Sequence, residues 1–86
     1  MGALSEAEAR ALAERAVEEA GGAREVYRNP RYALAMNATR TFTYDGLDVE
    51  LRHGEIASPA IVTVGGYVFE IHEDGIELLI RPRQRR

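Results

Sequence analysis

Glu70, His72 and Glu77 are the residues whose types and spacing come closest to a chemical site in this chain of 86 residues. Side chains alternate between the two faces of a strand, so Glu70 and His72 share one face. If Asp74-Gly75 is the turn that follows, Glu77 lies opposite His72. Such a trio can bind a divalent metal or hold a proton-transferring histidine. We favour a solvated cross-strand ion pair, worth about 1 kcal/mol or less, and expect no metal and no cofactor.

Other chemistry is poorly supported. Ser5 is needed as a helix cap and Ser58 precedes a proline, so neither is placed as a nucleophile. The absence of cysteine excludes a disulfide framework, a cysteine zinc site and a thiol nucleophile. Gly65-Gly66 lacks the following helix that a phosphate-binding loop requires. We therefore expect a protein that is not an enzyme and has no catalytic residues.

A helix is predicted over residues 5–20. Ser5 and Glu8 have the spacing of a capping box, and Gly21-Gly22 supplies the stop. The apolar residues that repeat with helical spacing are mostly small: Ala9, Leu12, Ala13, Ala16, Val17 and Ala20. Such a helix can approach a sheet closely, but the sheet must supply most of the core.

Three glycine-containing pairs predict β-hairpin turns: Asp45-Gly46, Gly65-Gly66 and Asp74-Gly75. Each turn brings apolar residues opposite apolar residues, and the last two hairpins agree on the buried face of the strand that they share. The sequence therefore predicts an α+β fold, with an N-terminal helix packed on one face of a five- or six-stranded antiparallel meander.

The strands of this meander fall within residues 24–80. Residues 24–28 are a weak strand candidate, and residues 31–38 either continue into the next strand or form one of their own. We expect one domain over residues 1–80, followed by a basic tail at residues 81–86.

The helix can cover only one face of the sheet, and the other face carries unexpected apolar residues. On the predicted core face lie Ala60, Val62, Val64, Tyr67, Phe69, Ile71, Leu78 and Ile80. Ile61, Val68 and Leu79 fall on the opposite face, where an exposed sheet is normally polar. Strand propensity alone is one explanation. We favour a covered patch, the cover being residues 23–30, a second copy of the chain or another protein.

The charge divides into an acidic body and a basic end. The net charge is −3, and all 11 basic residues are arginine, with no lysine. Residues 1–80 carry −7, whereas the tail carries +4 on Arg81, Arg83, Arg85 and Arg86. These arginines could contact phosphates, an acidic partner or the chain's own helix, or simply form a disordered end. The acidic body and the lack of interleaved aromatic residues argue against a dedicated nucleic-acid binder.

These features predict a small protein-binding module, such as a regulator, an inhibitor or an assembly subunit, that forms a homodimer through the outer sheet face. The contact candidates are Ile61, Val68, Leu79 and the four tail arginines. One alternative is a nucleic-acid-associated protein that uses the tail, and another is a ligand-binding or enzymatic domain with a pocket between helix and sheet. With no signal peptide and no apolar run of membrane length, we expect a cytoplasmic location and no membrane partner.

Overall fold

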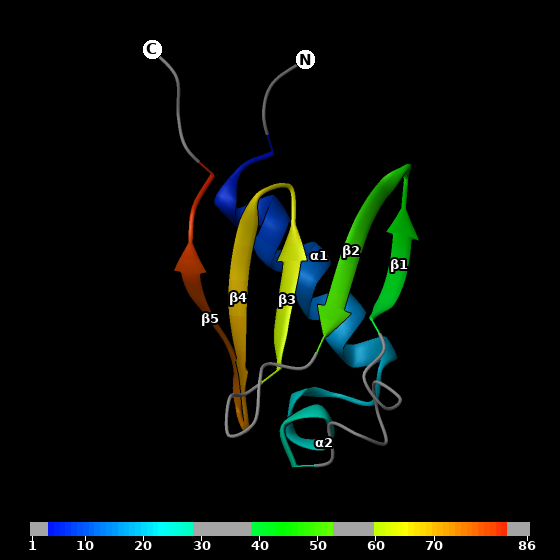
Figure 1. Ribbon diagram of the computed structural model, residues 1–86, viewed down its shortest axis with the longest axis vertical. Helices are drawn as coiled ribbons and strands as arrows, with labels where there is room; N and C mark the ends of the chain where they lie inside the picture. Colours follow the sequence, from blue (N-terminus) through cyan, green and yellow to red (C-terminus); the bar gives the residue numbers. More distant parts are fainter. Residues whose placement is uncertain (1–3, 29–38, 53–59, 83–86) are drawn as a thin grey trace.

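The computed structural model describes residues 4–28, 39–52 and 60–82. In chain order, the elements are α1 (Glu6–Glu19), α2 (Ala23–Arg28), β1 (Arg40–Tyr44), β2 (Leu47–Arg52), β3 (Ile61–Val64), β4 (Tyr67–His72) and β5 (Gly75–Ile80). The strands form one antiparallel sheet in sequence order, with α1 across one face and α2 at the end where β4 finishes (Figure 1). The predicted α+β fold is confirmed. Neither described helix has the length and apolar character that crossing a membrane requires.

Helix α1 begins and ends at the residues that the sequence indicates. The Ser5 hydroxyl accepts a hydrogen bond from the backbone N–H of Glu8 (3.1 Å), and the Ser5 N–H donates to the Glu8 carboxylate (2.9 Å). After Ala20, Gly21 and Gly22 take positive φ angles of 123° and 97°. The alanine side of α1 packs on the sheet. Its fully or nearly buried residues are Ala9, Ala13, Ala16, Val17 and Ala20.

The first two hairpins have the predicted registers. Asp45-Gly46 and Gly65-Gly66 all have positive φ, as a type I′ turn requires. Tyr44 lies opposite Leu47, and Val64 lies opposite Tyr67. The alternation in β4 is also as predicted, since Tyr67, Phe69 and Ile71 are buried while the residues between them are half-buried.

The last hairpin has a different register from the one predicted. Its loop is Glu73-Asp74, so His72 lies opposite Gly75 and Ile71 lies opposite Ile76. The prediction that Glu77 lies opposite His72 is therefore wrong, and Glu77 lies opposite Glu70 instead. The shift is two residues, which leaves the side chains of Ile76, Glu77 and Leu78 on their predicted faces because the strand pattern repeats every two residues.

A bulge at the end of β5 changes the position of Ile80. The prediction that Ile80 is a core residue is therefore wrong. Leu78 lies opposite Phe69 and Ile80 lies opposite Val68, so Leu79 is an extra residue between the two pairs. Ile80 shares the face of Val68, away from α1, and is 55% exposed.

Residues 24–28 form part of helix α2, which corrects the strand that the sequence indicated there. Val26 on this helix is fully buried and joins the same core as the alanines of α1. The segment thus packs on the inner face and does not cover the outer one. The strand considered at residues 31–38 lies outside the described residues. The sheet that the described residues form has five strands.

Candidate functional site

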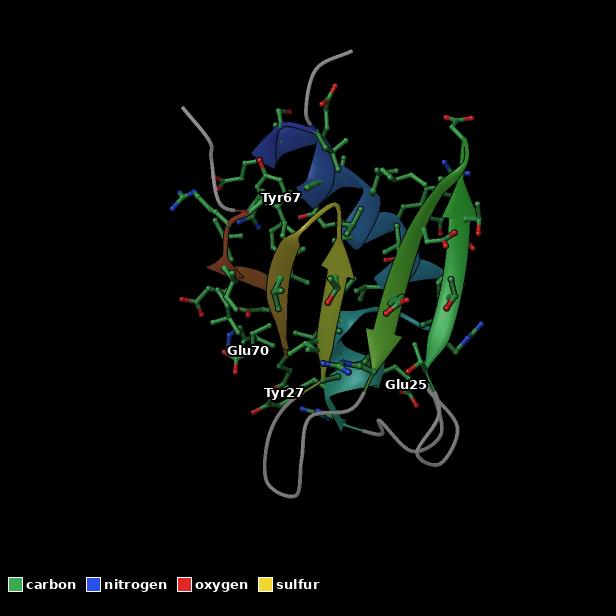
Figure 2. All side chains as sticks on the ribbon, turned by 45° about the horizontal axis from the view of Figure 1, so that its top comes forward. Glu25, Tyr27, Tyr67 and Glu70 are labelled. Atoms are coloured by element: carbon green, nitrogen blue, oxygen red, sulfur yellow. The ribbon has the colours of Figure 1, made fainter. Side chains whose placement is uncertain are left out.

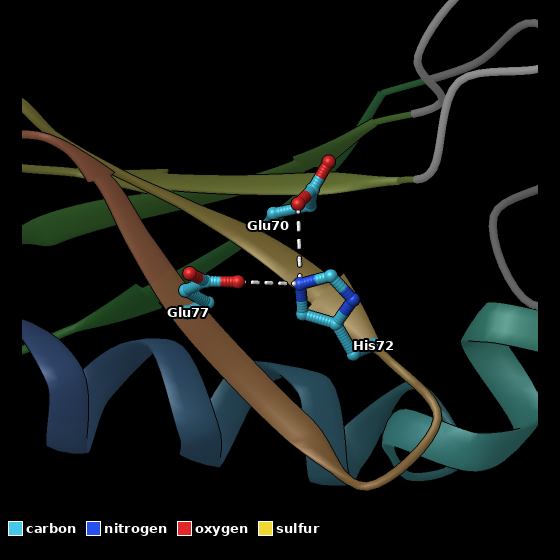
Figure 3. A group of neighbouring side chains, drawn as sticks. All are labelled: Glu70, His72 and Glu77. Atoms are coloured by element: carbon cyan, nitrogen blue, oxygen red, sulfur yellow. Dashed lines mark hydrogen bonds and ion pairs between the residues drawn. The ribbon is translucent and has the colours of Figure 1, made fainter.

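The side chains of Glu70, His72 and Glu77 converge on one point of the outer face (Figure 3). The Nε2 atom of His72 lies 3.1 Å from Oε1 of Glu70 and 2.9 Å from Oε1 of Glu77. The three potential ligand atoms all lie within 4.8 Å of one another. The sequence brought these residues together as a candidate trio, although through a different register.

The corrected register makes this cluster electrostatically unusual. Glu70 on β4 and Glu77 on β5 lie directly opposite each other. Like charges in that position are destabilising, and a cation between the carboxylates relieves the repulsion. The His72 imidazole occupies that position with the same ring nitrogen facing both carboxylates.

A hollow of about 590 Å³ lies beside the trio, between α2 and the β4–β5 hairpin. Its lining residues are Arg24, Tyr27, His72, Glu73, Asp74 and Glu77. The Glu73 carboxylate accepts a hydrogen bond from Arg28 Nε (2.7 Å), which ties α2 to the hairpin. Tyr27 and Tyr67 lie near opposite ends of the sheet, and Glu70 lies between them (Figure 2). Tyr27 is 45% exposed.

A second feature of the outer face is an apolar patch, which we define as Ile61, Val68, Leu79 and Ile80. Ile80 is opposite Val68, and Ile61 is diagonal to Val68 across β3 and β4. Leu79 and Ile80 are 51% and 55% exposed, and the other two are half-buried. The sequence predicted the first three members. It missed Ile80, because nothing in the alternation of β5 marks the bulge.

The described helices leave this patch uncovered. Helix α1 packs against β2, β3 and β4, and Val26 of α2 belongs to the core on the same side. Of the covers that the sequence suggested, residues 23–28 are therefore on the wrong face within the part of the chain that the structure describes. A second copy of the chain and a different protein stay open.

The first arginine of the predicted tail contacts the protein's own helix. The Arg81 guanidinium lies 3.1 Å from the Glu6 carboxylate in the first turn of α1, which was one of the expected roles for the tail. Arg83, Arg85 and Arg86 lie outside the described residues.

A smaller hollow, of about 360 Å³, lies between the start of α1 and the β1–β2 hairpin. Its lining includes the large apolar residues Leu4, Leu12, Tyr44 and Leu47. It lies at the rim of the helix–sheet contact, because the alanines of α1 close the centre: Ala9, Ala13 and Ala16 are fully buried.

Comparison of the chain with protein-family models, with curated proteins and with solved structures finds no match.

Proposed function

We propose that this protein is a small protein-binding module, without enzymatic activity, whose outer sheet face binds a second copy of the chain. The observation that carries the proposal is the exposure of Leu79 and Ile80 beside Val68, on a face that neither described helix covers. Exposed apolar residues that touch one another mark interaction surfaces more often than scattered ones do.

The charges at the two ends of the β5 part of the patch favour a second copy over an unrelated protein. Residues 77–81 read Glu-Leu-Leu-Ile-Arg, so an acid and a base flank three apolar residues. A two-fold axis through Leu79 makes two copies of this segment antiparallel and places Glu77 of each near Arg81 of the other. Both side chains are largely exposed, at 67% and 69%, and each makes an ion pair within its own chain, Glu77 with His72 and Arg81 with Glu6, which the dimer would exchange for a pair between the copies.

The patch consists of four apolar residues, two of which are half-buried, so it offers a small contact surface. A stable interface buries about 800 Å² on each partner, whereas an apolar patch on a monomer covers about 300–600 Å². The dimer is therefore expected to be reversible and to depend on protein concentration. We place it in the cytoplasm as part of the same proposal, which fractionation of source cells tests.

The test is Val68→Glu, which puts a charge at the centre of the patch. We expect the dimer to weaken by more than tenfold, because the new carboxylates would be buried without partners, while the monomer keeps its circular dichroism spectrum. Sedimentation across a concentration series measures the dissociation constant of the dimer, and a chelator in the buffer removes divalent metal ions. Thr41→Glu is the matched control, since it adds the same charge on the same face at β1; because Thr41 lies opposite Glu50, circular dichroism confirms that this variant folds, and it should dimerise like wild type.

A wild-type chain that stays monomeric at the highest attainable concentration rejects the homodimer. Equal weakening by the Thr41 variant shows that net charge, not the patch, controls association. If Val68→Glu fails to fold, Leu79→Asn replaces it, because Leu79 is half exposed on an edge strand.

A further inference from the structure

The imidazole of His72 lies where two opposed carboxylates of the outer face converge. Glu70 and Glu77 each direct one oxygen at Nε2 of His72, at 3.1 and 2.9 Å. This nitrogen carries at most one hydrogen, whatever the tautomer or the charge of the ring. One N–H can bond both oxygens only by sharing its hydrogen between them, which makes each hydrogen bond less linear than a single one. A metal ion that bonds all three atoms would satisfy the ring nitrogen and both carboxylates at once.

The spacing of the three atoms suits a metal ion. Bonds of about 2.1 Å place neighbouring ligands about 3.0–3.4 Å apart, at octahedral or tetrahedral angles. The two distances from His72 Nε2 are close to this range. All three atoms lie within 4.8 Å of one another, so a bound ion would require the two glutamate side chains to move closer together. β4 supplies two of the ligands and β5 the third, so the hairpin itself sets their positions.

We propose that Glu70, His72 and Glu77 form a binding site for a divalent transition-metal ion, of which Zn²⁺ is the best fit. An imidazole with two carboxylates favours zinc and its neighbours, whereas Ca²⁺ and Mg²⁺ prefer oxygen ligands alone. Three protein ligands on a partly exposed sheet leave further positions to water or to a ligand.

The surroundings contribute charges of both signs. Asp74 and Glu73 line the adjoining hollow on the hairpin side, and Glu73 is paired with Arg28. Arg24 of α2 lies on the opposite wall. An anionic group that binds the metal from the hollow would therefore meet a guanidinium. The site is an open one, whose metal is accessible to small molecules.

Calorimetric titration of the metal-free full chain with ZnCl₂ tests the proposal. We expect one Zn²⁺ per chain, binding that persists in a large excess of Mg²⁺, and a rise in thermal stability on binding. His72→Gln should abolish binding, and Glu70→Gln and Glu77→Gln should each weaken it by more than tenfold. With Co²⁺ as the probe, the absorption spectrum of the bound ion should be lost in the His72 variant.

Two control variants separate this site from general attraction to the acidic body. Glu50→Gln removes a carboxylate from the same outer face on β2, and His53→Gln removes the other histidine of the chain. Both should bind Zn²⁺ like wild type. No Zn²⁺ binding, binding that survives in His72→Gln, or equal weakening by Glu50→Gln or His53→Gln overturns the site. Because the dimer is measured in chelator, failure of either proposal leaves the other intact.

Discussion

Tyr44 shows how a single residue in this small core can couple folding to pH. The ring is buried, and Arg15 lies over it with its guanidinium carbon 4.1 Å from the ring centre. No described residue completes a well-formed hydrogen bond with its hydroxyl. Burial raises the pKa of Tyr44 above 10.0, the carboxylate of Glu19 raises it further, and Arg15 opposes the rise.

We expect Tyr44→Phe to remove part of the alkaline destabilisation of the fold. Because the pKa of Tyr44 is raised in the folded state, its stabilising effect is complete below pH 10.0 and is lost as the pH rises through the folded-state value. Phenylalanine has no proton to lose. At neutral pH the variant should differ from wild type by about 1 kcal/mol or less, since the lost hydroxyl lacks a well-formed hydrogen bond.

Urea unfolding of both proteins, near neutral pH and above pH 10.0, measures this difference. Equal alkaline losses in the two proteins would show that other groups control the alkaline limb. Tyr27→Phe is the control at an exposed position, and it should unfold like wild type at both pH values.

At the scale of elements, two hairpin turns with the same backbone conformation have different surroundings. Gly46 and Gly66 are both the second residue of a type I′ turn, with φ angles of 81° and 87°. An added Cβ at Gly46 meets no heavy atom within 4 Å, whereas one at Gly66 lies 2.8 Å from Cβ of Pro82. Pro82, two residues after the end of β5, is thus packed against the β3–β4 turn.

Alanine substitutions at these two glycines should lower the free energy of unfolding by different amounts, because only Gly66 is in contact with Pro82. Gly46→Ala should cost about 1 kcal/mol of unfolding free energy, from the positive φ angle alone. Gly66→Ala should cost about 1–3 kcal/mol more, because Pro82 must move. Denaturant unfolding measures both values. In a Pro82→Gly background the two costs should become equal. Equal costs in the chain that keeps Pro82 would contradict the contact between Gly66 and Pro82.

Local signals predicted most of the fold, and non-local pairing accounts for what they missed. The capping box at Ser5 and the Asp45-Gly46 turn are fixed by neighbouring residues, so the sequence shows them directly. The register of β5 is not local: a shift by two residues keeps Phe69 and Ile71 opposite apolar partners, and the pattern cannot distinguish the two registers. The six residues of α2 are too few to show a helical period.

The candidate site was predictable to the same extent. Period two placed Glu70 and His72 on one face, and it identified Val68 as an outward apolar residue. The opposition of Glu70 and Glu77 depends on the register, and the exposure of Ile80 depends on the bulge. Both follow from how the edge strand meets β4, which alternation alone does not specify.

At the scale of the whole molecule, the outer face combines an apolar patch with a charged cluster, and β5 contributes to both. Glu77 belongs to the trio with His72, and Leu79 and Ile80 belong to the patch. α1 begins near the end of β5 (Figure 1), and there Arg81 contacts Glu6. In the proposed dimer, Arg81 would exchange Glu6 for Glu77 of the other copy, so that oppositely charged ends of β5 meet.

Exchanging those charges tests the geometry of the dimer independently of its apolar contacts. Glu77→Arg alone and Arg81→Glu alone should each weaken dimerisation by about tenfold, since two symmetry-related attractions of a few tenths to about 1 kcal/mol each become repulsions. The double variant Glu77→Arg/Arg81→Glu restores both attractions in the antiparallel arrangement, so its dissociation constant should return close to that of wild type. Sedimentation in chelator, with circular dichroism to confirm folding, gives the four constants. If the loss of dimerisation free energy in the double variant equals the sum of the losses in the two single variants, the two copies do not meet about an axis through Leu79.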